Sequence, residues 1–81
     1  MGITNFTGGT KPIGATITAG GLSEGLTVRA WRQGVSYPMT WKGAYYQVTV
    51  PYYGTYTVNR SGSSVYIDVF VNANGNYVVT F

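Results

Sequence analysis

The sequence predicts a small all-β domain, a single antiparallel β-sandwich of about seven strands with no helix. Apolar and polar residues alternate at every second position along most of the chain, which is the period of a half-buried strand. Clusters of Gly, Pro, Asn and Ser interrupt this alternation at intervals of roughly 8 to 12 residues, as in sandwiches and small barrels. No segment repeats its apolar residues with the helical period.

The length and the missing residue types limit the chemistry. The chain has 81 residues, which suits one small domain. It contains no cysteine and no histidine, which excludes disulfides, thiol chemistry, zinc sites and His-based catalysis. Because a small domain buries a modest fraction of its surface, contact with a partner would add to its stability.

The surface is expected to be nearly neutral. Charged residues make up 9% of the chain and aromatic residues 16%, with eight tyrosines, whereas an ordinary domain has about 25% charged residues. The net charge is +3, and the lysines and arginines are scattered singly rather than in a run. This spacing favours solvated surface charge over a nucleic-acid patch.

No targeting or membrane segment is evident. The first 20 residues have no apolar stretch of the length that a secretory signal needs. No run of about 18 apolar residues occurs anywhere. We therefore expect a protein without a signal peptide that does not cross a membrane.

Residues 1–13 read as an N-terminal arm or lead-in to the domain. Gly8, Gly9 and Pro12 interrupt them, and no clean alternation is present. Two interpretations stay open: a fraying terminus, or an arm that Ile3 and Phe6 anchor on a neighbouring subunit.

The first two expected strands are Gly14–Ala19 and Leu26–Arg32. In the second strand the aliphatic residues alternate with Arg29 and Trp31. If the aliphatic residues face the core, Arg29 and Trp31 share the outer face, and an exposed Trp calls for an explanation.

The stretch Val35–Trp41 is expected to form a third strand. It contains Pro38, which cannot donate a hydrogen bond to a neighbouring strand. This strand should therefore lie at a sheet edge or carry a bulge.

The central stretch Ala44–Val58 predicts two strands joined by a tight turn. Pro51–Gly54 has the residues of such a turn, because Pro presets φ and Gly accepts positive φ. The two strands are expected to be antiparallel neighbours. Tyr52 and Tyr53 flank the turn and cannot both point inward, so at least one should be exposed.

The last third predicts two more strands. In Ser63–Val71, Tyr66, Asp68 and Phe70 alternate with aliphatic residues and should face outward. Asn74-Gly75 is a strong hairpin signal, and it leads into a final strand that ends at the C-terminal Phe81.

The order of these segments resembles a known family. GATITA, LTVRAWRQG, VTVPYYGTYTV and NANGNYVVTF follow the pattern of small immunoglobulin-like modules of the carboxypeptidase-regulatory, transthyretin-like type, which recur in structural proteins of bacteriophages. The resemblance covers about Gly14–Phe81. It implies a module at residues 14–81 preceded by the arm at 1–13, for which the family offers no counterpart.

The resemblance also implies a role in a virus particle. This copy is more aromatic than is usual, with Trp31, Trp41 and the Tyr45-Tyr46 pair. A module that stands alone resembles a capsid decoration or accessory virion protein more than a tail fibre. The implied location is the virion, after synthesis in the host cytoplasm.

No enzymatic arrangement is recognisable. Glu24 and Asp68 are the only carboxylates, one in a glycine-rich loop and the other on an outward strand face. A glycosidase would need this pair at the correct separation, and a metal site would need more oxygen ligands. We predict a non-enzymatic protein without cofactor or metal.

The functions left to consider are binding and assembly. Interfaces favour Tyr, Trp and Arg, and the expected partners are other virion proteins or further copies of the chain in a homo-oligomer. A carbohydrate-binding module for host-surface glycans is the alternative, and single-stranded nucleic-acid binding on an aromatic face is the weakest. The candidate contact residues are Arg29, Trp31, Tyr52, Tyr53, Tyr66 and Phe70, with Ile3 and Phe6 in the arm.

Overall fold

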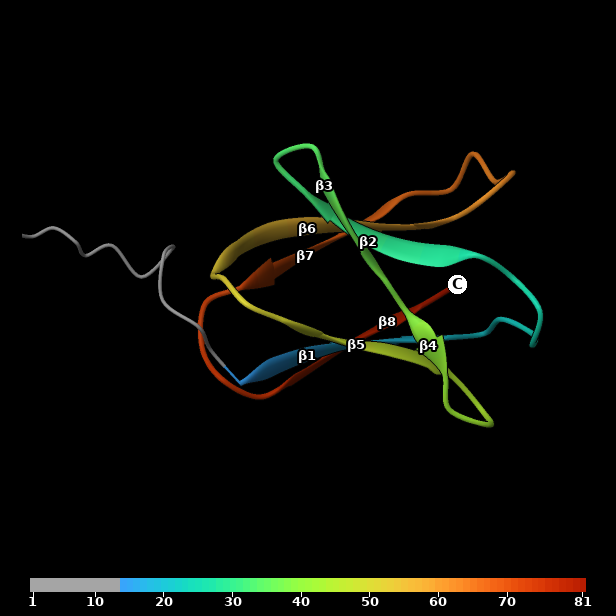
Figure 1. The fold of residues 1–81 in the computed structure, drawn as a ribbon, viewed down its shortest axis with the longest axis horizontal. Helices are drawn as coiled ribbons and strands as arrows, with labels where there is room; N and C mark the ends of the chain where they lie inside the picture. The colour runs from blue at the N-terminus through green and yellow to red at the C-terminus, as the bar shows by residue number, and fades with distance from the viewer. Residues whose placement is uncertain (1–13) are drawn as a thin grey trace, which may run out of the picture.

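The computed structural model describes residues 14–81, which form two four-stranded sheets stacked face to face (Figure 1). No helix occurs within this range, and the predicted all-β sandwich is confirmed, with eight strands in place of about seven. The strands are β1 (Ala15–Gly20), β2 (Val28–Arg32), β3 (Val35–Pro38), β4 (Thr40–Trp41), β5 (Tyr46–Val50), β6 (Gly54–Arg60), β7 (Ile67–Val71) and β8 (Asn76–Thr80).

The two sheets have different strand orders. Sheet A has the order β4-β5-β1-β8, and sheet B has the order β3-β2-β6-β7. All neighbours in sheet B are antiparallel. In sheet A, β1 is antiparallel to β5 but parallel to β8. This one parallel pair departs from the purely antiparallel sandwich that the sequence predicted.

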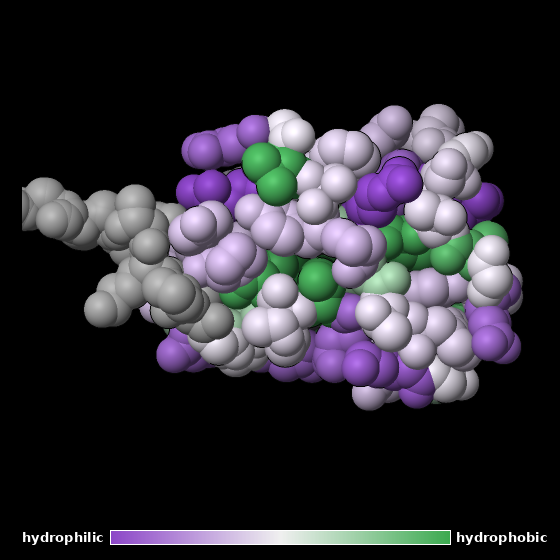
Figure 2. All heavy atoms as spheres, viewed as in Figure 1, coloured by the Kyte–Doolittle hydropathy of each residue, from purple (hydrophilic) through white to green (hydrophobic). Residues whose placement is uncertain are grey.

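The core lies between the sheets and consists of the inward residues of the alternating pattern. In Figure 2, hydrophobic residues run along the middle of the molecule, and hydrophilic residues lie above and below them. The buried hydrophobic residues come from both sheets and from the junction of β3 and β4: Ala15, Ile17, Ala19, Val28, Ala30, Met39, Tyr46, Val50, Tyr56, Val58, Val71 and Val79.

The prediction for the central stretch is partly wrong. Both strands exist, but β5 pairs with β1 and β4 in sheet A, whereas β6 pairs with β2 and β7 in sheet B. Residues 51–53 cross from one sheet to the other instead of closing a hairpin, and Gly54 has a φ of 135°. The crossing is favoured because it puts Val50 and Tyr56 on opposite sides of one core, each with no exposed surface.

The hairpin expected at Asn74-Gly75 is also absent, because β7 belongs to sheet B and β8 to sheet A. The two residues hold the start of β1 instead. The Asn74 side-chain oxygen accepts the Gly14 N–H at 3.0 Å, and the Gly75 carbonyl accepts the Thr16 N–H at 2.8 Å.

The third predicted strand divides in two. Within Val35–Trp41 the chain leaves sheet B after Pro38 and joins sheet A at Thr40, and the buried Met39 lies between. The Met39 N–H donates to the Val28 carbonyl at 2.8 Å. Pro38 does end an edge strand, as expected from its missing donor.

Tyrosine hydroxyls fasten three of the crossings between the sheets. The Tyr46 hydroxyl donates to the Ser23 carbonyl at 2.7 Å and accepts the Leu26 N–H, which holds the β1–β2 loop. The Tyr56 hydroxyl donates to the Tyr52 carbonyl at 2.8 Å, four residues upstream, in the manner of the tyrosine corner of Greek-key sandwiches. The Tyr77 hydroxyl accepts the N–H of Ala73 at 3.1 Å in the β7–β8 loop.

Candidate functional site

The outer face of sheet B brings three of the predicted contact residues, Arg29, Trp31 and Phe70, onto one sheet surface. Trp31 on β2 is in register with Thr57 on β6, and Thr57 with Asp68 on β7. Phe70, two residues after Asp68, is in register with Thr55. Register partners in adjacent strands project on the same side of a sheet, so these side chains form one surface.

Aromatic and charged groups lie close together on this surface, which we call the sheet B face. The Arg29 guanidinium lies 5.9 Å from the centre of the Trp31 ring, within cation–π range. The Thr57 hydroxyl donates to the Asp68 carboxylate at 2.8 Å. The exposed fractions are 39% for Trp31 and 62% for Phe70. Each aromatic ring therefore has a polar or charged neighbour on the same face.

Tyr66 lies just before β7 and is the most exposed large hydrophobic residue described, at 65%. Asn59 holds the loop that carries it, because its side-chain amide donates to the carbonyls of Ser63 at 3.1 Å and Val65 at 2.8 Å. The register places Asn59 beside Arg29 on the sheet B face. Asn59 is not among the contact residues predicted from the sequence. Its position at the end of an alternating strand was the available signal.

Tyr52 and Tyr53 belong to a different place, the β5–β6 crossing. The Arg32 side chain donates from Nε to the Tyr53 carbonyl at 3.0 Å, and its guanidinium lies 5.2 Å from the centre of the Tyr52 ring. Both tyrosines are half-buried, and Tyr53 packs against the core. The structure thus gives these two candidates a part in holding the crossing. Ile3 and Phe6 lie outside the described residues.

The outer face of sheet A is polar and bonded to itself. Gln47 donates to the Thr18 hydroxyl at 2.9 Å, and Thr18 and Thr16 both donate to the Asn76 side-chain oxygen, at 2.7 and 2.8 Å. These bonds cross β5, β1 and β8. The side chains of this network are already paired with one another, and Val78 on β8 is exposed beside them.

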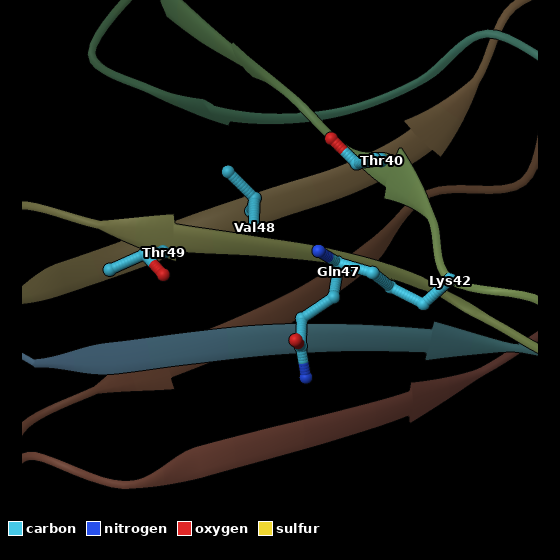
Figure 3. A pocket seen from close by; sticks show the side chains of 5 residues that line it. All are labelled: Thr40, Lys42, Gln47, Val48 and Thr49. Carbon is cyan, nitrogen blue, oxygen red and sulfur yellow. The ribbon is translucent and has the colours of Figure 1, made fainter.

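A hollow of about 240 Å³ opens at the β5 edge, where the short β4 leaves part of β5 uncovered (Figure 3). Val48 points to one side of the strand, and Gln47 and Thr49 point to the other. Lys42 is the only charged lining residue, and Thr40 completes the wall. The lining of the hollow thus combines one cation with neutral polar side chains and Val48.

The described part of the chain shows neither a cluster of metal-binding side chains nor a membrane-spanning helix. Residues 14–81 contain no group of three or more His, Cys, Asp or Glu residues that could hold a metal ion. None of the described segments is a helix long and apolar enough to cross a membrane.

Comparison with known proteins supports the fold and nothing finer. The chain matches no protein-family model and no curated protein. It resembles the crystal structure of a DUF3823 family protein from Bacteroides ovatus, with a TM-score of 0.57 and 20% identity over 82% of this chain. The match covers 42% of that protein, so this chain spans less than half of its length. At this identity the likeness shows a shared β-rich fold, without the immunoglobulin-like or bacteriophage assignment.

Proposed function

We propose that this chain is a non-enzymatic assembly module, a decoration or accessory protein of a virus particle, whose sheet B face makes protein–protein contacts. One observation carries the proposal: Arg29, Trp31 and Phe70, chosen from the sequence for their chemistry, project from the same side of sheet B, and the exposed Tyr66 directly precedes β7 in that sheet. The virion setting rests on the sequence resemblance of Gly14–Phe81 to bacteriophage modules.

The composition of the face fits a protein partner. Tyr, Trp and Arg are enriched at the centres of interfaces, where each side chain buries a large area, whereas other charged residues are depleted there. Trp31 and Phe70 project from paired strands, so their backbone is already ordered before a partner arrives. Binding then costs less conformational entropy than it would on a loop.

Self-association is the first test. We expect the mass of the full chain in light scattering to rise with concentration and reach a defined oligomer. Trp31→Ala should shift this transition to about tenfold higher concentration, since truncating a central interface aromatic typically costs more than 1 kcal/mol.

A matched control distinguishes an effect of the sheet B face from the general effect of losing an aromatic ring. Tyr45 is 37% exposed, close to the 39% of Trp31, but it lies at the β4–β5 turn beside sheet A. Tyr45→Ala should leave the transition unchanged. A full chain that stays monomeric, both alone and mixed with purified virus particles, would overturn the proposal.

A glycan partner is the second candidate, favoured by the exposed Trp31 ring, with Arg29 beside it and Asp68 two strands away on the same face. Such a ring can lie against a sugar while neighbouring polar groups take its hydroxyls. Titration with purified cell-wall glycans, followed by tryptophan fluorescence, tests this function. A saturable change that Trp31→Ala removes, in a chain that stays monomeric, would favour it over assembly.

A further inference from the structure

β7 is an open edge of sheet B. Within residues 14–81 it pairs only with β6, and its other side has no strand partner. An edge strand presents a row of free N–H and C=O groups, which is a template for another strand.

This edge lacks the usual protection. At the opposite edges of the two sheets, β3 ends on Pro38 and β4 is two residues long, and both features discourage strand addition. The remaining edge, β8, is as long as β7 but has one exposed large hydrophobic residue, Val78. β7 spans five residues, Ile67–Val71, without proline or lysine. Asp68 is its one charge, and Thr57 already hydrogen-bonds that carboxylate.

The open edge is flanked by exposed apolar side chains. Tyr66 is 65% exposed, Phe70 62% and Val65 53%. An added strand would cover part of this surface while its backbone pairs with β7, which combines main-chain affinity with side-chain contacts.

The sequence of the N-terminal segment suits the role of this added strand. Residues 2–7 read GITNFT and carry no charged side chain. Ile, Thr and Phe favour strands, so pairing this segment with β7 would bury no side-chain charge. Gly14 donates its N–H to Asn74 in the β7–β8 loop at 3.0 Å. The chain therefore enters the sandwich at the end where β7 finishes.

This entry point favours a second copy as the source of the strand. Six residues, 8–13, separate this segment from Gly14 of its own chain, and fully extended they span about 20 Å. A strand antiparallel to the five-residue β7 would need that connection to run back along nearly the whole of β7, so the short connection favours a parallel strand within one chain. The same segment from another copy is free to run antiparallel, the pairing that is slightly more stable per residue.

We propose that the β7 edge accepts residues 2–7 of a second copy as an added antiparallel strand. The site is formed by backbone and is separate from the Trp31 contacts of the sheet B face. Two copies can exchange the segment reciprocally, or each copy in an open series can donate its segment to the next copy.

Disulfide trapping tests this inference, because the natural chain has no cysteine. Full chains carrying Phe6→Cys or Thr7→Cys, which project to opposite sides of a strand, are each mixed with Phe70→Cys and oxidised. One of the two mixtures should give mixed dimers in about tenfold higher yield than the control at micromolar protein, since pairing raises the local thiol concentration towards the millimolar range.

The control is Val78→Cys on β8, the edge strand of sheet A. Val78 is 63% exposed against 62% for Phe70, so the two thiols are equally accessible. Equal yields at the two positions would overturn the proposal. A chain with both Phe6→Cys and Phe70→Cys that closes only within itself would overturn the second copy as donor.

A failure of this inference can be distinguished from a failure of the proposed function. Trapping is repeated with Trp31→Ala present in both partners. We expect the yield to persist, because Trp31 lies on β2 and not at the β7 edge. Loss of trapping in this background would show that the edge has no independent affinity and would overturn the inference.

Discussion

At the scale of single residues, buried tyrosines do more than fill space. Tyr46 and Tyr56 are almost fully buried, and each hydroxyl holds the backbone of a crossing loop. The sequence indicated both as core residues through their register with aliphatic neighbours. It gave no sign of their hydrogen bonds, because the acceptors lie in loops whose path depends on the fold.

Tyr56→Phe should lower the free energy of unfolding by about 1 kcal/mol, the typical net value of one hydrogen bond. The ring stays in place, but the Tyr52 carbonyl loses its partner. Chemical denaturation measures the change. Tyr45→Phe, at an exposed turn residue, should change the stability by less than about 0.5 kcal/mol, and equal losses at both sites would contradict the role of this bond.

Tyr56 should also make stability depend on alkaline pH. Burial raises the pKa of its hydroxyl above the ordinary value of about 10. The unfolded chain then loses this proton at a lower pH than the folded chain does. The contribution of the neutral Tyr56 hydroxyl to stability is therefore complete below about pH 10 and is lost as the pH rises from about 10 through the folded-state pKa. Melting temperatures between about pH 8 and 11 should therefore fall more steeply for the natural chain than for Tyr56→Phe. If the melting temperatures of the two proteins fell in parallel with pH, this prediction would be wrong.

At the scale of elements, the β5–β6 crossing depends on the absence of a side chain at Gly54. Its φ is 135°, and a Cβ there would lie 2.8 Å from Nε of Arg32. The same Nε donates to the Tyr53 carbonyl, so Arg32 cannot move away without breaking that bond. The sequence indicated a glycine turn here, but the reason for the glycine is the approach of Arg32 from β2.

Gly54→Ala should cost about 2 kcal/mol or more, because backbone strain adds to the displacement of Arg32. Thermal and denaturant unfolding measure the loss. Gly20→Ala is the control, since a Cβ there meets nothing within 4 Å and no positive φ is involved. If the two variants were equally stable, Arg32 would be yielding freely and the crossing would not depend on it.

At the scale of the whole molecule, the two faces of the sandwich differ in what they leave unpaired. On sheet A, Gln47, Thr18 and Asn76 are hydrogen-bonded to one another, and Val78 is an exposed aliphatic side chain beside them. On sheet B, Trp31 and Phe70 remain exposed. Such an asymmetry is a reason to expect assembly through one side of the domain.

Assembly through that side should make the melting temperature depend on protein concentration, because association of the folded state stabilises it by mass action. We expect the melting temperature of the natural chain to rise over a hundredfold range of concentration, and that of Trp31→Ala to stay nearly constant. Scanning calorimetry measures both. A constant melting temperature for the natural chain would contradict self-association.

The fold class, the position of most strands and the buried side of each strand follow from the sequence alone. The strand period is local, so Ile17, Val28, Tyr56 and Val71 could be assigned to the core. The same alternation put Arg29, Trp31 and Phe70 on an outward face. These assignments need only the neighbours of each residue in the chain.

Only the tertiary structure decided which sheet each strand joins. Pro51–Gly54 and Asn74-Gly75 have the residues of tight turns, but a turn motif does not distinguish a hairpin from a crossing between two sheets. That choice depends on burying the inner faces of both sheets in one core, on partners such as Gly14 and Asn74, 60 residues apart, and on the tyrosine hydroxyls that fasten the crossings. The assignment of strands to sheets also places Trp31 and Phe70 on the same face of sheet B. Tyr52 and Tyr53 lie away from that face, at the β5–β6 crossing.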